Sequence, residues 1–208
     1  MDAAIISRGR IASLFCWKRI TVLSVVIRIF DIIFSLIGLV SGLPILLVIW
    51  ILGLLDTGSP IFRQERVGRN MKSFSLFKFR TMSRDTVSVA SHLASSSSIT
   101  PLGSFLRKTK LDEIPQLWNV LKGDMSLVGP RPNLFNQAEL IHERDALAVY
   151  SVRPGITGLA QVKDIDMSTP ELLAKTDAEM ISTMSVVNYF KYIFLTFAGK
   201  GQGDRVGR

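Results

Sequence analysis

The sequence predicts an α+β fold that is mostly helical, with a re-entrant membrane helix joined to a small domain that contains one β-hairpin. Three observations lead to this fold class. Residues 32–55 carry no charged side chain, residues 61–82 include a stretch of alternating side chains, and several short segments after residue 100 show helical spacing. The expected units along the chain are an N-terminal segment (residues 1–31), the membrane helix (32–55), the small domain (56–198) and a tail (199–208).

The composition points to an anionic partner and leaves little room for cysteine or histidine chemistry. Of the 208 residues, 48% are hydrophobic, and the net charge is +8 with a pI near 9.9. Such a balance suits a membrane surface, a nucleic acid or a phosphorylated substrate. The single cysteine, Cys16, excludes an internal disulfide and a multi-cysteine metal site. With only His92 and His142, a catalytic triad or a histidine-rich zinc site has few candidate residues.

The N-terminal segment, residues 1–31, mixes cations with aromatic side chains such as Trp17. This mixture predicts a basic interfacial helix at a membrane surface. For residues 1–10, a disordered basic tail fits the composition equally well. Arg28 and Asp31 are three positions apart, so they are expected to pair where the helix enters the membrane.

The uncharged run at residues 32–55 would reach about 36 Å as a straight helix, enough to cross the hydrocarbon core. It is too long for a signal peptide. Pro44 lies in the middle of the run, and basic residues flank both ends, although the positive-inside rule puts basic flanks on the cytoplasmic side. A helix that is broken near Pro44 and returns to the same face satisfies both observations. The alternative is a true span that Pro44 only kinks.

The segment that follows predicts a β-hairpin with cations near one end. Within residues 61–82, alternating side chains favour strands and residues 68–70 favour a turn. The hairpin carries Lys78 and Arg80, which either bind a phosphate or face water and lipid headgroups. The Ser-rich residues 83–100 predict a surface loop.

The stretch LDEIPQLWNVLKGDMSLVGPRP, residues 111–132, combines an acidic pair, a short helix and a constrained arginine. The predicted apolar helix face consists of Ile114, Leu117, Trp118 and Leu121. Gly123 predicts the helix end, so Asp112 and Glu113 lie at or just before its start, where phosphate also binds well. Prolines on both sides fix the backbone of Arg131, whose guanidinium suits bidentate phosphate binding.

The acidic pair also has an ordinary interpretation. An Asp before a helix is commonly an N-cap, and a Glu in the first turn offsets the helix dipole. An acidic pair without a neighbouring His or Cys is only a weak indication of a metal site.

The remaining segments complete the domain. Pro154 and Gly155 predict a type II turn with the glycine at positive φ. A later helix contains Asp177. Residues 185–197 are aromatic and apolar, so they either pack on the core or lie along a bilayer surface. The basic, glycine-rich residues 199–208 predict a flexible tail.

Five motifs in order carry a family resemblance: IRIFDIIFSLIGLVSGLPILL, FRQERVGRN, FKFRTM, LRKTKLDEIPQLWNVLKGDMSLVGPRP and SVRPGITGLAQV. They closely resemble the bacterial sugar transferases, the monotopic phosphoglycosyl transferases, over residues 28–162. The resemblance implies an enzyme that moves a sugar-1-phosphate from a UDP-sugar to undecaprenyl phosphate, releases UMP and initiates surface polysaccharide or glycan assembly. It also implies location at the bacterial inner (cytoplasmic) membrane, with the catalytic domain on the cytoplasmic face.

Matched to the family motifs, Asp112 is the expected nucleophile, which forms a covalent aspartyl phospho-sugar, and Glu113 is expected to help hold Mg²⁺. The candidates for substrate and phosphate binding are Lys78, Arg80, Arg107 and Arg131, and the additional site candidates are Gln161 and Asp177. Elementary chemistry agrees with these roles. A carboxylate is a good phosphoryl acceptor when cations offset the charge repulsion, and Mg²⁺ prefers few carboxylates combined with phosphate oxygens and water.

The sequence departs from the family pattern at several places. Glu179 and Met180 stand where aromatic residues usually follow the family's Asp, matched here to Asp177, and an N-terminal extension of about 20 residues precedes the family's usual start. Leu43 stands where the family often has Ser before the membrane Pro, and residues 163–166 replace the usual Gly-Arg-Asn-like loop. The sugar, the polymer and the oligomeric state therefore stay open.

Two other functions compete with the transferase. A membrane-tethered nucleic-acid binder would explain the basic charge, but the cations adjoin an acidic pair and no nucleic-acid-binding motif is present, so no nucleic acid is expected as a partner. A catalytically silent membrane scaffold of a glycan-assembly complex would keep the fold, but the acidic pair and Arg131 are intact.

Overall fold

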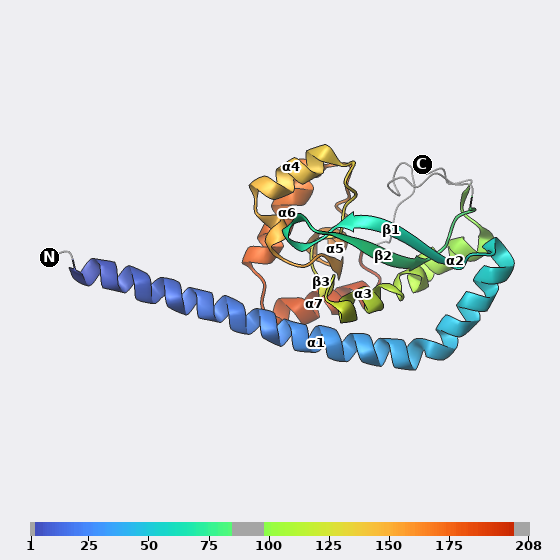
Figure 1. Ribbon diagram of the computed structural model, residues 1–208, viewed down its shortest axis with the longest axis horizontal. Helices are drawn as coiled ribbons and strands as arrows, with labels where there is room; N and C mark the ends of the chain where they lie inside the picture. Colours follow the sequence, from blue (N-terminus) through green and yellow to red (C-terminus); the bar gives the residue numbers. More distant parts are fainter. Residues whose placement is uncertain (1–2, 85–97, 202–208) are drawn as a thin grey trace.

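The computed structural model describes residues 3–84 and 98–201, with side chains from residue 22 onward (Figure 1). The α-helices are α1 (Ala3–Thr57), α2 (Pro101–Thr109), α3 (Gln116–Lys122), α4 (Ala138–Ala146), α5 (Leu159–Val162), α6 (Pro170–Ser182) and α7 (Val186–Phe197). The strands are β1 (Ile61–Val67), β2 (Ser73–Phe79), β3 (Ser126–Val128) and β4 (Gly155–Thr157), and the 3-10 helices are η1 (Arg69–Met71), η4 (Leu111–Glu113) and η5 (Val149–Ser151). The predicted α+β class with a helical majority is confirmed. Most of the predicted loop at residues 83–100 and of the predicted tail at residues 199–208 lies outside the described residues.

Helix α1 runs along one side of the folded domain and then bends toward the start of the hairpin (Figure 1). It continues through Pro44, so the predicted interfacial segment and the predicted membrane segment belong to one helix. Its part Val22–Thr57 contains an 18-residue stretch with a mean hydropathy of 2.7 and is long and apolar enough to cross a membrane, by length and composition. A return to the same membrane face stays a prediction.

The predicted pair Arg28 and Asp31 is present, with Arg28 Nη1 4.0 Å from Asp31 Oδ2. Both side chains are mainly engaged with the rest of the domain. Arg28 donates to the carbonyls of Val120 and Leu121 at the end of α3, at 2.7 and 3.0 Å. The buried carboxylate of Asp31 reaches β3 and α7. The pair therefore joins α1 to the domain.

The hairpin forms where the alternation predicted it. Strands β1 and β2 are antiparallel, with Ile61 opposite Phe79 and Val67 opposite Ser73. The predicted turn is also confirmed, and it continues to Met71: Asn70 and Met71 adopt positive φ values of 55° and 61°. The buried side chains of the hairpin include Phe74 and Leu76 on β2, which pack on Val120 and Met125. The hairpin thus covers α3 and the segment that follows it.

Helix α3 ends at Gly123 (φ 93°), as predicted, but the predicted apolar face is not the most buried side of the helix. Trp118 is 53% exposed, whereas Asn119 and Val120 are fully buried. The reason is that α3 lies between α1 and the hairpin. Asn119 accepts from Phe77 N (3.1 Å) and donates to the carbonyl of Ser75 (2.7 Å), so a polar side chain faces strand β2.

The predicted type II turn at Gly155 is wrong. In the described chain Gly155 does not have a positive φ, and it begins strand β4, which pairs in parallel with β3. A Cβ at Gly155 would lie 2.0 Å from Gly129 N. Close approach of two backbones, and not turn geometry, therefore requires glycine here.

Of the two alternatives predicted for residues 185–197, packing on the core is confirmed for one face of helix α7, and a position along a bilayer surface stays a prediction. Tyr189 and Tyr192 are buried in a cluster with Val128 and Met180, while Phe194 and Phe197 are 70% and 87% exposed. One face of α7 therefore belongs to the core, and the opposite face is apolar and exposed.

Candidate active site

The acidic pair lies in the short turn η4, between α2 and α3. Lys110 precedes the turn in the left-handed conformation (φ 58°), and Pro115 precedes the first residue of α3. The prediction that the pair stands just before a helix is therefore confirmed. Asp112 is buried, with 6% of its surface exposed, and Glu113 follows on the same turn.

Glu113 is the centre of a charge cluster built from three segments of the chain. Lys78 Nζ, from β2, lies 3.1 Å from Glu113 Oε1, and Arg131 Nη2, from the segment after β3, lies 3.1 Å from the same oxygen. All three side chains are largely shielded from solvent. Two cations on one carboxylate oxygen leave the cluster with an excess of positive charge, which suits a phosphate ligand.

A recess adjoins this cluster. It is lined by Arg66, Leu76, Lys78, Gln116, Arg131, Pro132, Gly155 and Ile156. Arg66 is buried on β1 and donates to the carbonyl of Pro132 (3.1 Å) and to Gln64 Oε1 (2.5 Å). Sequence reasoning missed Arg66, because a cation on a strand looks like a solvent-facing residue. The motif FRQERVGRN was the one signal that could have drawn attention to it.

Arg107 and Arg80 each donate to a residue that flanks the hairpin. Arg107 Nε, in the last turn of α2, donates to Thr81 Oγ1 at 2.9 Å. Arg80 Nε donates to the carbonyl of Ser59 at 2.8 Å, and its guanidinium lies 5.5 Å from the centroid of the Phe62 ring. Arg80 follows the end of β2, so it is held beside the start of β1, whereas Lys78 reaches Glu113.

Lys110 is a charged neighbour that sequence reasoning did not select as a site residue. Burial lowers the pKa of its ammonium group, and the nearby charge of Arg131 acts in the same direction, while Glu113 and Asp164 oppose it. Lys110 Nζ donates to the carbonyl of Lys200 at 3.1 Å. Its position two residues before Asp112 was the available signal.

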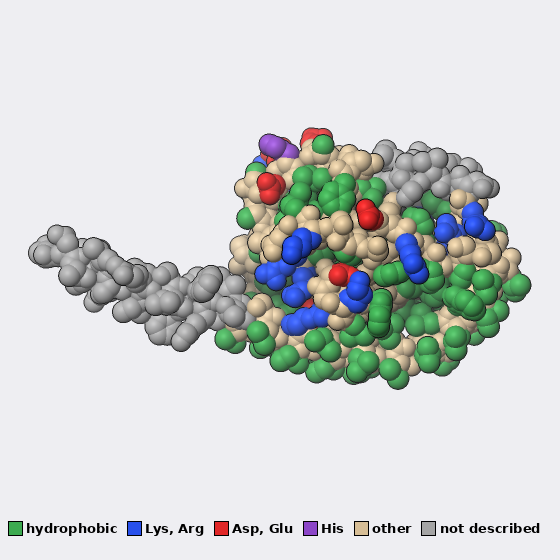
Figure 2. Space-filling view, in the orientation of Figure 1, with side chains coloured by type: hydrophobic (Ala, Val, Ile, Leu, Met, Phe, Trp, Pro, Cys, Tyr) green, Lys and Arg blue, Asp and Glu red, His purple; other side chains and the backbone are tan. Residues whose placement is uncertain are grey.

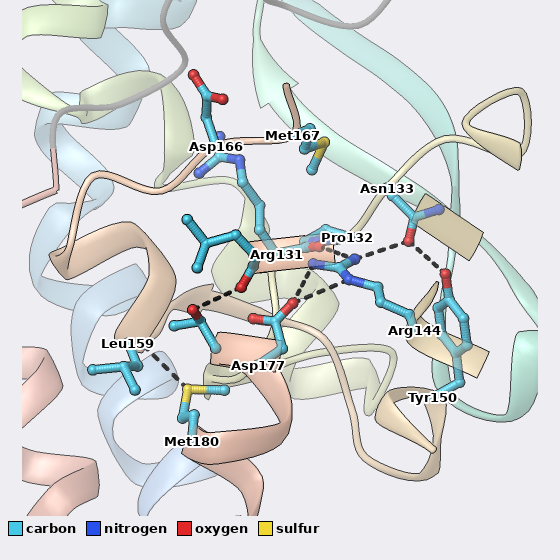
Figure 3. Close-up of polar contacts among 12 residues, drawn as sticks. Arg131, Pro132, Asn133, Arg144, Tyr150, Leu159, Asp166, Met167, Asp177 and Met180 are labelled. Atoms are coloured by element: carbon cyan, nitrogen blue, oxygen red, sulfur yellow. Dashed lines mark hydrogen bonds and ion pairs between the residues drawn. The ribbon is translucent and has the colours of Figure 1, made fainter. Parts of the chain in front are cut away.

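The two additional candidates do not contact the acidic pair through any described hydrogen bond. Asp177, on α6, is fully buried and pairs with Arg144 of α4, whose Nε and Nη2 lie 3.0 and 2.7 Å from Asp177 Oδ2 (Figure 3). Gln161, on α5, has both side-chain amide atoms buried, without a hydrogen-bond partner among the described residues. Asp177 connects indirectly to the cluster, because Arg144 also donates to the carbonyl of Arg131 at 2.8 Å.

The acidic pair can serve Mg²⁺ only together with substrate oxygens. Among residues 3–84 and 98–201, no group of three or more His, Cys, Asp or Glu side chains could hold a metal ion. Mg²⁺ commonly binds one or two carboxylates together with substrate phosphates and water. A diphosphate substrate beside Asp112 and Glu113 meets that description, so the residues present fit a substrate-borne Mg²⁺.

Comparison of the sequence with known protein families gives one match. The family model described as bacterial sugar transferase matches residues 22–201. The chain therefore belongs to the bacterial sugar transferase family.

Individual relatives agree with this assignment. The chain is 38% identical over 162 residues to the undecaprenyl-phosphate galactose phosphotransferase of Salmonella typhimurium. This match covers 68% of this chain and 34% of that protein. It is 48% identical over 108 residues to a putative undecaprenyl-phosphate N-acetylgalactosaminyl 1-phosphate transferase of Bacillus subtilis, covering 50% of this chain and 60% of that protein. It is 38% identical over 180 residues to the exopolysaccharide production protein PSS of Rhizobium leguminosarum, covering 80% and 87%. The chain thus spans about a third of the Salmonella protein and most of the Rhizobium protein.

Proposed function

We propose that this protein transfers a sugar-1-phosphate from a UDP-sugar to undecaprenyl phosphate, releases UMP, and so initiates the assembly of a surface polysaccharide or glycan. The observation that carries the proposal is the cluster in which Lys78 and Arg131 meet on Glu113, next to the buried Asp112. Relatives named as undecaprenyl-phosphate sugar phosphotransferases support the same acceptor.

Asp112 acts as the nucleophile. One carboxylate oxygen bonds to the sugar-bearing phosphorus of the donor, and the bond from that phosphorus to the bridging oxygen breaks. UMP leaves with the bridging oxygen and its electron pair. A phosphate oxygen of undecaprenyl phosphate then attacks the same phosphorus, which releases the Asp112 carboxylate and gives the polyprenyl-diphosphate sugar.

The surrounding cations make attack by one anion on another feasible. Glu113 fixes Lys78 and Arg131, so their N–H groups are already oriented when the diphosphate of the UDP-sugar binds. Arg66 adds a buried positive charge to the recess between them. Arg107, at the end of α2, adds to the positive field of the site.

Glu113 would hold Mg²⁺, together with diphosphate oxygens of the substrate. The bound ion would neutralise charge on the leaving group. The residues of the chain contribute separately: Asp112 supplies the acceptor carboxylate, and Lys78 and Arg131 bind the phosphoryl oxygens.

The membrane supplies the second substrate. Exposed apolar side chains line α1, and further ones project from α3 and α7, including Trp118 and Phe194. Apolar side chains gather along the edge of the molecule formed by α1 (Figure 2). A surface of this kind places the domain at the bilayer, where the phosphate of a polyprenyl lipid lies. The site belongs on the cytoplasmic face of the bacterial inner membrane, where a soluble nucleotide sugar is available.

The re-entrant topology can be tested by labelling. With Cys16 replaced, single cysteines at Arg10 and Asn70 should both resist a membrane-impermeant thiol reagent applied from the periplasmic side, and both should react after the membrane is opened. Reaction of one position from outside in intact cells would instead make α1 a true span.

The reaction is tested by UMP release from a panel of UDP-sugars, with purified protein, Mg²⁺ and undecaprenyl phosphate. The wild type should release UMP with at least one sugar, and incubation without acceptor should add one phospho-sugar to the protein mass. Asp112→Asn should lose both signals, whereas Asp145→Asn, an exposed carboxylate on α4, should keep both.

Two results would overturn the proposal. Unchanged turnover in Asp112→Asn would remove Asp112 as the nucleophile. Binding of UDP-sugars without any turnover would instead favour the catalytically silent scaffold.

A further inference from the structure

The backbone around Arg131 is held at four consecutive carbonyl groups. Gly155 N donates to Pro130 O at 2.9 Å, and Val67 N donates to Asn133 O at 2.9 Å. Between them, Arg144 Nη1 donates to Arg131 O at 2.8 Å, and Arg66 Nη1 donates to Pro132 O at 3.1 Å. The two outer carbonyls thus bond to neighbouring backbone, and the two inner carbonyls bond to buried arginine side chains.

The prolines explain why side chains are needed here. Pro130 and Pro132 have no N–H group, so this segment cannot form a regular strand ladder with its neighbours. The hydrogen bond to the Pro132 carbonyl is nevertheless buried, and the bond to the Arg131 carbonyl is partly buried. Buried carbonyls need donors, and the long guanidinium groups reach them from α4 and β1.

The donor from α4 is itself fixed. Arg144 is 1% exposed and binds Asp177 Oδ2 through two nitrogens. Its Nη1 also donates to Asn133 Oδ1 at 2.9 Å, and Tyr150 Oη donates to the same oxygen at 3.0 Å. Figure 3 shows Arg144 lying between Asp177 and Asn133, with the backbone of Arg131 beside it. The guanidinium of Arg144 thus makes four hydrogen bonds, two to Asp177, one to Asn133 and one to the carbonyl of Arg131, and these bonds fix its orientation.

We propose that the buried pair Arg144–Asp177 is a positioning device for Arg131, and that it sets the rate of phosphoryl transfer without contacting the substrate. The inference rests on the proposed function, because it assigns a role to Arg131 in that reaction. Asp177 orients Arg144, Arg144 holds the carbonyl of Arg131, and the side chain of Arg131 then meets Glu113 at 3.1 Å. Small misplacement of a group that stabilises a transition state costs rate more than affinity.

A kinetic double-mutant cycle tests the proposal in the full-length protein. The variants are Asp177→Asn, Arg131→Met and the double variant, and rates are expressed per active site from single-turnover amplitudes. Asp177→Asn should lower kcat about 10- to 100-fold with KM changed less than about 3-fold. In the Arg131→Met background, Asp177→Asn should have no further effect on kcat. Equal effects of Asp177→Asn in both backgrounds would overturn the proposal.

Two variants separate geometry from charge and from folding. Arg144→Lys keeps the positive charge but cannot make the forked contact, so it should lose rate as Asp177→Asn does, and a wild-type rate would contradict positioning. If Asp177→Asn does not fold, Tyr150→Phe removes only one hydrogen bond of the network and should show the same non-additivity with a smaller loss. Glu171→Gln, at the exposed Glu171–Lys175 pair of the same helix, is the matched control and should leave kcat unchanged.

Failure of the proposed function would be recognised separately, as absence of UMP release by the wild type. Hydrogen exchange needs no substrate, so it then tests whether the Arg144–Asp177 pair holds the backbone around Arg131. Asp177→Asn should speed exchange in residues 129–135 while exchange in the hairpin β1–β2 stays unchanged, and Glu171→Gln should alter neither. Unchanged exchange in residues 129–135 would overturn the inference.

Discussion

Removing the carboxylate of Asp31 should loosen the joint between α1 and the rest of the domain. Asp31 is 1% exposed, and its Oδ1 accepts three hydrogen bonds: from Ser126 Oγ (3.0 Å), Leu127 N (2.9 Å) and Tyr189 Oη (2.9 Å). The donors come from β3 and α7, far from α1 in the sequence. One carboxylate thus ties three elements together.

The expected cost follows from these contacts. Asp31→Ala leaves three donors without their acceptor, and a buried donor left unsatisfied costs about 1–3 kcal/mol. Partial repacking reduces the sum, so the free energy of unfolding should fall by about 3–5 kcal/mol. Asp31→Asn keeps an acceptor oxygen and loses only the charge, so its cost should be about 1–2 kcal/mol.

The assay is unfolding of the detergent-solubilised protein, followed by the signal of the domain. For a chain of this size, 3–5 kcal/mol corresponds to a fall in Tm of roughly 6–20 °C. Asp124→Asn, at a partly exposed ion pair with Lys122, serves as the control and should shift Tm by less than about 3 °C. A shift for Asp31→Ala as small as that of the control would refute the reasoning, because the three bonds would then not limit stability.

Two further predictions concern the site and its buried pair. Lys78→Met should reduce turnover at least about 100-fold, whereas Arg80→Met should reduce turnover less than about 5-fold. The reason is that Lys78 contacts Glu113 and Arg80 contacts Ser59. Similar losses for the two variants in UMP-release assays would contradict this placement. Burial raises the pKa of Asp177 above 3.8 despite Arg144, so the folded state keeps this proton to higher pH than the unfolded chain. The contribution of this carboxyl group to stability is full below pH 3.8 and is lost as pH rises through the folded pKa. Asp177→Asn should therefore flatten the dependence of the unfolding free energy on pH in that window. An unchanged acid slope in denaturant titrations would contradict this prediction.

Local patterns predicted the elements that depend on local physics. The alternation on β2, the turn after β1 and the glycine that ends α3 each follow from a few neighbouring residues, and the structure contains all three. The acidic pair was correctly placed before α3 for the same reason. Lys78 and Arg131 were also selected from sequence, and they meet on Glu113.

The buried face of α3 shows where local patterns fail. Helical spacing placed Trp118 on the apolar face of this helix, but Trp118 is exposed while Asn119 is buried. The apolar face of this helix borders α1 and the exposed apolar edge of the molecule, and the amide of Asn119 satisfies backbone groups of β2. Spacing measures how apolar a face is, but it does not distinguish a protein core from a lipid-facing surface.

Buried charges were the least predictable part of the site. Arg66 and Arg144 resemble solvent-facing cations in the sequence, since a buried arginine is recognised only by its partners. Those partners are distant: Arg66 reaches Pro132, and Arg144 reaches Asp177 on another helix. Because Pro130 and Pro132 exclude regular pairing around Arg131, the fold must bring donors from elsewhere to the intervening carbonyls. The constraint that makes the PRP motif recognisable in sequence is therefore also the reason that remote arginines are needed to hold Arg131 against Glu113.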